Sequence, residues 1–294
     1  MQNIKAYVFL IFCTLFWAGN FIVGKIATLF EIPPFTLNFY RWLIAFLILF
    51  PFTYKKIFEG FEEIKNKIVP LSLMGFTSIT IFNSVVYYSL NFTQVLNGVL
   101  MISTIPVLII FFSSCFTSER IKFIQIIGVS TSLFGVLIII TKLEFYKLLN
   151  LNLNKGDLWI LVAMISWATY SIMVKEKKIN LPPFALLETL IFLGLIFLIP
   201  FYLLELSNAQ YLKINIPVIL TIGYVVFFAG IGAYIFWIGA IQLIGPSRSG
   251  VFLHLMPIFS SLMAIFLLGE KLAIFHILGA SFIIFGIFLS TKFK

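Results

Sequence analysis

Two stretches of the chain decide its fold: PVLIIFFSSCFTSERIKFIQIIGVSTSLFG at residues 106–135 and PIFSSLMAIFLLGEKLAIFHILGASFIIFG at residues 257–286. In both, a proline leads an apolar run, a Glu-Arg or Glu-Lys pair interrupts it, and two glycines seven residues apart follow. A single offset of 151 residues aligns all of these positions. The pattern predicts a duplicated helical hairpin, with the charged pair at the turn between two long apolar helices.

The composition places this hairpin in a membrane. The chain has 61% hydrophobic residues, 11% charged residues and a mean hydropathy of +1.11, whereas a soluble domain carries about 25% charged residues. Its net charge of +9 does not predict nucleic-acid binding, because the basic residues lie in short connections between apolar runs. The sequence therefore predicts an all-α integral membrane protein with the lipid bilayer as its surroundings.

Ten apolar segments are long enough to span a bilayer, whose core is about 30 Å thick and needs about 20 residues per helix. Two of them begin at Pro33-Pro34 and Pro182-Pro183, and proline is favoured in a first helical turn. The predicted spans are residues 5–29, 34–54, 68–90, 93–117, 121–141, 156–175, 183–204, 216–241, 246–268 and 271–291.

The basic residues predict the orientation of these spans, because cytoplasmic loops are enriched in lysine and arginine. With the N-terminus inside, thirteen of these residues fall on the cytoplasmic side and five on the other, while Lys25 and Arg41 fall within spans. We therefore expect both termini to be cytoplasmic.

The duplication extends beyond the two hairpins. Trp17-Ala18 recurs as Trp167-Ala168, and Pro33-Pro34-Phe35 recurs as Pro182-Pro183-Phe184. Residues 1–147 and 148–294 are thus predicted to be two repeats of five helices. Since five is odd, the second repeat enters the membrane from the opposite side, and such inverted repeats are typical of secondary transporters.

With these features, the chain resembles the EamA family of the drug/metabolite transporter superfamily. The resemblance implies a multi-pass bacterial inner-membrane carrier of small metabolites, often an exporter of amino acids or related compounds, and it identifies no substrate. The residues that carry it are Trp17, Asn20, Arg41 and Trp42 near the start, then Pro106, Glu119, Arg120, Gly128 and Gly135, and finally Pro257, Glu270, Lys271, Gly279 and Gly286.

Most of the duplicated residues are interpreted as scaffold. Glu119 and Glu270 fall at opposite membrane faces, where each can cap the helix that follows. The paired glycines share one helix face and permit close packing in lipid. Pro106 and Pro257 lie within spans, where each is either a hinge or a passive kink.

Candidate residues for a substrate cavity lie on shared helix faces. The repeat aligns Trp17 with Trp167, Asn20 with Tyr170 and Asn83 with Tyr234, which directs four helices at one region. A mostly apolar cavity with a few hydrogen-bonding groups suits a small organic solute; the alternative is that these aromatic residues face lipid. The candidates on these faces are Trp17, Asn20, Asn83, Tyr87, Trp167, Tyr170, Tyr234 and Trp237.

Two further candidates are ionisable residues within spans, where such residues are costly. Arg41 has Leu190 at its repeat-equivalent position, so it is interpreted either as a contact for an anionic group or ion pair, or as a side chain that reaches the membrane surface. His254 shares a helix face with Pro257. It either carries a proton or contacts substrate, or it forms a hydrogen bond between helices.

The preferred function is a secondary transporter of small organic metabolites, working by alternating access and without a cofactor. A drug or toxic-compound efflux carrier is the alternative. A channel would require a continuous polar pore, and a lipid-modifying enzyme would require clustered acids, histidines or metal ligands; neither pattern is present. Substrate, direction, proton or counter-solute coupling and oligomeric state stay open.

Overall fold

The computed structural model describes residues 2–89, 91–93, 95–117, 121–148, 154–208, 212, 214–268 and 271–292, and throughout these ranges the chain is helical apart from short connections. Side chains at positions 2, 21, 22, 24–26, 28, 29, 95–97, 267 and 268 are not described. Glu119, Arg120 and Glu270, the predicted turn and cap residues, lie outside the described residues.

The helices follow the order that the sequence predicts. Those of the first half are α1 (Gln2–Leu29), α2 (Pro34–Glu59), α3 (Phe61–Asn66), α4 (Ile68–Gly75), η1 (Phe76–Phe82), α5 (Asn83–Ser89), α6 (Val95–Ile102), α7 (Ile105–Phe116), α8 (Phe123–Thr141) and η2 (Phe145–Leu148). Those of the second half are α9 (Lys155–Glu176), α10 (Pro183–Ser207), α11 (Ile216–Tyr224), η3 (Val225–Gly232), α12 (Ala233–Ile244), α13 (Pro246–Gly250), η4 (Val251–His254), α14 (Leu255–Leu268) and α15 (Ile274–Lys292).

These segments form the predicted membrane-spanning set. Among the described residues, nine helices are long and apolar enough to cross a membrane, and the 28-residue α1 packs between them as the tenth. As predicted, Pro34 and Pro183 occupy the first turns of α2 and α10. The short α3 and η2 were not predicted.

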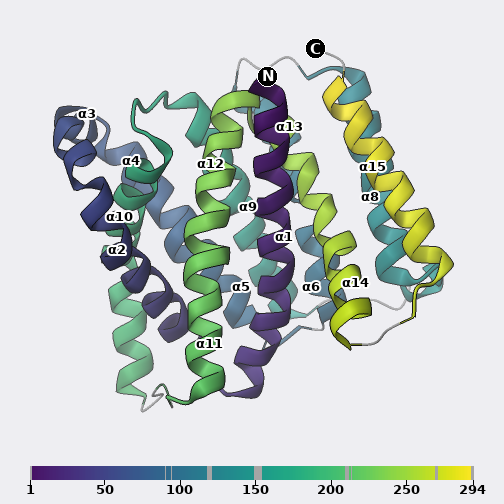
Figure 1. Cartoon of the computed structure of the whole chain (residues 1–294), viewed down its shortest axis with the longest axis horizontal. Coiled ribbons are helices and arrows are strands. Elements are labelled where there is room, and N and C mark those ends of the chain that lie inside the picture. Colours follow the sequence, from purple (N-terminus) through teal and green to yellow (C-terminus); the bar gives the residue numbers. More distant parts are fainter. Residues whose placement is uncertain are drawn as a thin grey trace.

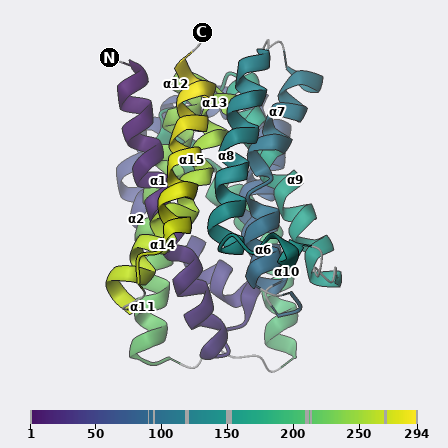
Figure 2. The ribbon, with the colours of Figure 1, turned by 90° about the vertical axis from the view of Figure 1, so that its right-hand side faces the viewer.

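The two halves have opposite directions in the bundle (Figures 1 and 2). α1 begins at the end of the molecule where α15 finishes, whereas α9, which opens the second half, runs towards that end. We call the end of the molecule where α1 begins and α15 finishes the terminal end. Each opening helix packs on the other half: α1 lies against α12 and α14, and α9 lies against η1, α5 and α7. The chain is therefore an inverted repeat whose halves interlock.

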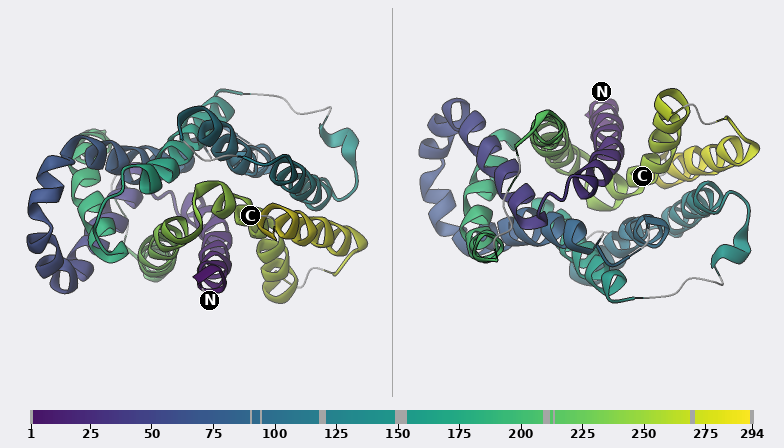
Figure 3. Two further views of the ribbon diagram at one scale, coloured as in Figure 1. Left: turned by 90° about the horizontal axis from the view of Figure 1, so that it is seen from above. Right: turned by 90° about the horizontal axis from the view of Figure 1, so that it is seen from below.

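Glycine permits a close helix contact between α8 and α15. A Cβ atom on Gly128 would lie 2.7 Å from the Gly286 carbonyl oxygen, and one on Gly135 would lie 2.6 Å from the Gly279 carbonyl oxygen. The predicted close packing of these glycines is confirmed. This pair closes one edge of the molecule, opposite the edge formed by α2 and α3 (Figures 1 and 3).

Both third spans contain a π-helical segment at corresponding positions. η1 ends immediately before Asn83, and η3 ends at Gly232, so that one residue, Ala233, separates it from Tyr234. A π segment shifts hydrogen bonding from the usual i→i+4 pattern, and such segments often occur at functional sites. The Ser78 carbonyl of η1 accepts bonds from the Asn83 amide and the Tyr234 hydroxyl, at 3.1 and 2.9 Å.

A carboxylate of the second half caps a helix of the first. The two Glu205 oxygens accept bonds from the backbone N–H groups of Phe35 and Thr36, at 3.0 and 2.7 Å, and from the Thr36 hydroxyl at 2.9 Å. These groups open α2, whose N-cap is Pro33 and whose first turn contains no acid of its own. The contact joins the halves at the end opposite the termini.

We expect Glu205→Ala to destabilise the protein, because three donors, two of them at the positive end of a helix dipole, lose a charged acceptor. We expect the free energy of unfolding to fall by about 2–4 kcal/mol when hydrogen bonds of this kind are lost. The measurement is the melting temperature of the detergent-purified protein. The matched control is Glu62→Ala, which removes an exposed glutamate and should leave the melting temperature unchanged; an equal effect of both substitutions would contradict the capping role.

Candidate functional site: a cavity between the two halves

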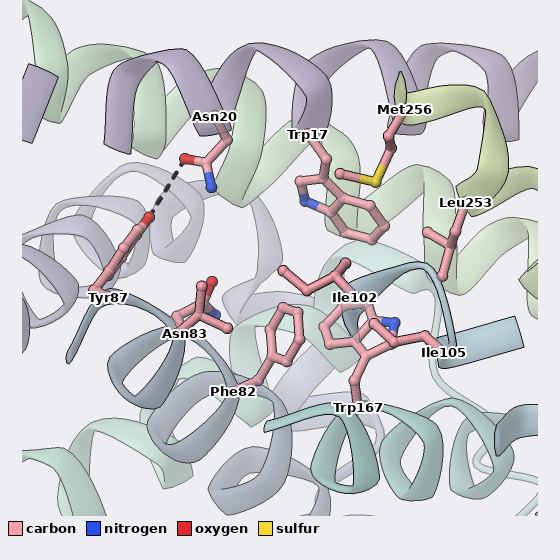
Figure 4. Close-up of a pocket in the computed structure, with 11 residues that line it drawn as sticks. Trp17, Asn20, Phe82, Asn83, Tyr87, Ile102, Ile105, Trp167, Leu253 and Met256 are labelled. Carbon is pink, nitrogen blue, oxygen red and sulfur yellow. Dashed lines mark hydrogen bonds between the residues drawn. The ribbon is translucent and has the colours of Figure 1, made fainter. Parts of the chain in front are cut away.

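A cavity lies between the two halves of the bundle, with an empty volume of about 640 Å³ that includes space open to solvent. Figure 4 shows Trp17 and Asn20 of α1 facing Phe82, Asn83 and Tyr87 across it. The other described residues that line it are Val86, Ile102, Ile105, Trp167, Leu253 and Met256. Its walls are therefore aromatic and aliphatic, with amide and hydroxyl groups confined to one part.

Five aromatic residues, the aromatic cluster, pack beside this cavity: Trp17, Trp167, Tyr170, Tyr234 and Trp237. The Trp17 ring centroid lies 5.1 Å from that of Trp167 and 5.5 Å from that of Trp237. Tyr170 and Tyr234 have no exposed surface. Tyr170 lies one turn beyond Trp167 along α9, towards the terminal end. The cluster is thus buried beside the cavity, on the side towards that end.

Arg41 of α2 lies directly behind the cavity wall and is fully buried. Its Nη1 donates to the Asn83 Oδ1 at 2.8 Å and to the Tyr87 hydroxyl at 3.0 Å. Its Nη2 donates to the Ala229 carbonyl oxygen at 2.8 Å, and its guanidinium carbon lies 4.8 Å from the Trp42 ring centroid. All of these partners are neutral, so the contacts position the cation without neutralising it.

A chain of hydrogen bonds connects Arg41 to the cavity. The Tyr87 hydroxyl, which accepts from Arg41, donates to the Asn20 Oδ1 at 3.3 Å, as the dashed line in Figure 4 shows. On the other side, the Asn83 Nδ2 donates to the Tyr234 hydroxyl at 2.8 Å. The polar part of the wall is therefore one network centred on the guanidinium.

Repeat-equivalent residues meet at this site. Asn83 and Tyr234, which are 151 positions apart, share a hydrogen bond, and the rings of Trp17 and Trp167 are in contact. Equivalent residues touch only near the axis that relates two halves. The cavity is consequently close to the pseudo-symmetry axis of the inverted repeat.

His254 does not belong to the lining of this cavity. Its Nδ1 lies 2.5 Å from the Ser132 hydroxyl oxygen and its Nε2 lies 2.8 Å from the Ser103 carbonyl oxygen. Because a carbonyl oxygen can only accept, the Nε2–H group donates to Ser103, while the Nδ1 shares a hydrogen bond with the Ser132 hydroxyl. Ser103 stands at the interruption between α6 and α7 that precedes Pro106, so the geometry corresponds to the helix-to-helix hydrogen bond considered from the sequence.

The second proline has a similar setting. Pro257 follows the 3₁₀ segment η4 at the start of α14, so both prolines lie beside a departure from regular α-helix. The structure thus interrupts regular α-helix beside both prolines. A hinge function for Pro106 and Pro257 stays a prediction.

The structure brings most predicted site residues together. Of these, Trp17, Asn20, Asn83, Tyr87 and Trp167 line the cavity. Arg41 and Tyr234 bond to that wall, Tyr170 and Trp237 belong to the aromatic cluster, and His254 is absent from the lining. Sequence analysis missed the apolar lining residues Phe82, Val86, Ile102, Ile105, Leu253 and Met256, because similar residues fill every span.

Comparison with known proteins shows which family and which proteins this chain is similar to. The model of the EamA-like transporter family matches the chain twice, over residues 4–141 and 154–292. An uncharacterized transporter of Archaeoglobus fulgidus is 27% identical over 99% of this chain and 98% of its own length. A probable amino-acid metabolite efflux pump of Salmonella typhimurium is 26% identical over 94% of this chain and 91% of its own length.

A solved structure supports the fold. A crystal structure of another protein matches with a TM-score of 0.77 and 14% identity, covering 98% of this chain and 96% of that one. With the family match across both halves, the protein is a multi-pass membrane transporter of small molecules and not an enzyme. The chain belongs to the EamA-like transporter family.

Proposed function

We propose that the protein is a secondary transporter that exports small organic metabolites, such as amino acids or related compounds, by alternating access. The observation that carries this proposal is the cavity on the pseudo-symmetry axis, bounded on one side by the buried aromatic cluster. Relatives described as amino-acid metabolite efflux pumps support the substrate class and the direction.

The inverted repeat supplies the physical basis for alternation. Two halves of similar structure and opposite direction can exchange conformations, and the exchange moves the opening from one membrane face to the other. In this proposal the aromatic cluster is the barrier between the cavity and the terminal end, and the burial of Tyr170, Tyr234 and Trp237 supports that role. Opening at that end requires these side chains to separate.

The proposed location is the bacterial inner membrane, with both termini in the cytoplasm. The excess of lysine and arginine in the connections on that side supports the orientation. The cavity then lies on the external side of the aromatic cluster.

Cysteine accessibility in proteoliposomes tests alternation. In a Cys13→Ser, Cys115→Ser background, we expect Val86→Cys in the cavity to react with a membrane-impermeant maleimide from the external side. Tyr170→Cys should react only from the terminal side, and a solute that drives counterflow should change the two rates in opposite directions. Val162→Cys, whose valine is exposed on the outer surface of α9, is the control and should react slowly from both sides.

Two results would contradict this function. Simultaneous reaction of positions 86 and 170 in one population, together with uncoupled solute flux, would identify a channel. A failure of counterflow across a panel of amino acids, organic acids and amines would exclude a carrier of these solutes.

A further inference from the structure

Arg41 brings a positive charge into the bundle, and no acidic side chain among the described residues forms an ion pair with it. The ion pairs Lys56–Glu59, Lys67–Glu63 and Lys147–Glu144 join described residues, and none of them involves Arg41. The Arg41 Nε has no hydrogen-bond partner. A buried charge at membrane depth is costly unless it is paired or serves a ligand.

The scaffold alone does not account for this arginine. The equivalent position of the second half holds Leu190, which is also fully buried, so the fold accommodates an apolar side chain there. The charge therefore belongs to a feature in which the halves differ, and its nearest such feature is the polar wall of the cavity.

In the chain of hydrogen bonds that leads from Arg41 to the cavity, each donor lies on the Arg41 side and each acceptor on the cavity side. Arg41 donates to the Tyr87 hydroxyl, and Tyr87 donates to the Asn20 Oδ1. The Asn20 Nδ2, at the end of this chain, has no acceptor among the described residues and belongs to the cavity wall. Successive hydrogen bonds polarise one another in the same direction. The guanidinium therefore makes the free N–H group of Asn20, which faces the cavity, a stronger hydrogen-bond donor.

The other polar groups near this donor already have partners. The Asn83 Oδ1 accepts from Arg41, and the Trp17 Nε1 donates to the Ala229 carbonyl oxygen at 3.1 Å. No aspartate or glutamate is among the described lining residues. The wall consequently offers a donor and a net positive charge to a ligand, beside three aromatic rings.

We propose that the cavity binds solutes that carry a carboxylate on an apolar or aromatic body. The Asn20 amide donates to the carboxylate, Arg41 attracts it through Tyr87, and the body packs against Trp17, Phe82 and Trp167. One net charge and one free amide match a monovalent carboxylate better than a doubly charged phosphate. This assignment rests on the proposed function, because it treats the cavity as the transported solute's site.

Binding to the purified protein in detergent tests the charge requirement directly. The probes are carboxylate and amide pairs of equal shape, from acetate and acetamide to 3-phenylpropanoate and 3-phenylpropanamide, with 2-phenylethylamine as the cation. We expect at least one carboxylate to raise the melting temperature with concentration and to change tryptophan fluorescence. Its amide partner and the amine should bind at least tenfold more weakly.

Substitutions of Arg41 test whether this arginine causes the preference for a carboxylate. Three hydrogen bonds and the Asn20 amide separate the guanidinium from the carboxylate, a distance of about 10 Å. At an effective dielectric constant of about 20 their attraction corresponds to about 15-fold in affinity. Arg41→Gln should lose this factor, and Arg41→Lys should retain part of it. Arg248→Gln, which removes an arginine from α13 outside the cavity lining, should bind like the parent.

Three outcomes would overturn the inference. They are equal binding of a carboxylate and its amide, no response to any carboxylate, and undiminished carboxylate binding by a folded Arg41→Gln variant. The first two need no variant, so a poorly folded substitution does not prevent the test. Counterflow of neutral or cationic solutes without carboxylate preference would overturn this inference and leave the transporter intact, whereas carboxylate binding without counterflow would overturn the proposed function instead.

Discussion

Replacing Asn20 by aspartate is expected to abolish carboxylate binding and transport, with an affinity loss of at least about 100-fold. Aspartate has nearly the shape of asparagine, and one of its oxygens can still accept from the Tyr87 hydroxyl. The other oxygen replaces the free Nδ2 donor with a negative charge. At about 5 Å and an effective dielectric constant of about 20, this charge repels a carboxylate by about 3 kcal/mol.

The same substitution should improve the binding of a cation of similar shape. The measurement is the affinity of purified Asn20→Asp protein for 3-phenylpropanoate and 2-phenylethylamine, followed by counterflow with the better ligand. Asn20→Ala removes the donor without adding charge, and its expected loss is about tenfold, as for one hydrogen bond to a charged group. Asn208→Asp adds the same charge at an exposed position and should leave both affinities unchanged.

An exchange of preference from anion to cation would be difficult to obtain from a folding defect. If Asn20→Asp and Asn20→Ala lower carboxylate affinity equally, the electrostatic role of this wall is wrong, and Asn20 contributes only a hydrogen bond. If neither substitution changes affinity, the solute binds elsewhere in the bundle.

The fold follows from the sequence because each of its determinants is periodic or repeated. Apolar runs in the sequence predict the spans, and prolines predict where α2 and α10 begin. Glycines seven residues apart predict the close contact between α8 and α15. The inversion follows from the odd number of helices in each repeat. By contrast, the π segments η1 and η3 leave no mark in a hydropathy pattern, since a one-residue shift in hydrogen bonding changes no composition.

The candidate site was predictable where polar or aromatic residues share a helix face, as for Trp17 with Asn20 and Asn83 with Tyr87. The partners of Arg41 were not predictable. One of them is the Ala229 carbonyl oxygen, which belongs to the π segment η3 and carries no side-chain signal. Similarly, Glu205 caps a helix 170 positions away in sequence, a contact that depends on how the two halves pack.

The strongest effect on folding is expected at Gly286. A Cβ atom there would lie 2.4 Å from the Gly128 carbonyl oxygen and 2.5 Å from the Ser132 backbone nitrogen. Both obstacles are backbone atoms of α8, so a side-chain rotation cannot relieve the contact, and the two helices must separate. Apolar helices in lipid gain little from hydrophobic burial, and their association depends on close van der Waals packing.

Gly286→Ala should therefore destabilise the protein by about 2–3 kcal/mol, the upper part of the range for overpacked sites, and Gly286→Leu should prevent recovery of folded protein. Gly135→Ala should have a similar effect, because its Cβ would meet the Gly279 carbonyl oxygen at 2.6 Å. The measurements are the melting temperature in detergent and the fraction of protein that elutes as a single species.

Gly223→Ala provides the matched control, because outside its chain neighbours and the backbone of its own helix turns no atom lies within 4 Å of the Cβ position there. Alanine is favoured over glycine in a helix by about 1 kcal/mol, so this control should leave stability unchanged or raise it. The same substitution is thus expected to have opposite signs at positions 223 and 286. Equal effects at both positions would mean that α8 and α15 do not approach closely in the membrane, and that the glycines of the duplicated hairpin have another role.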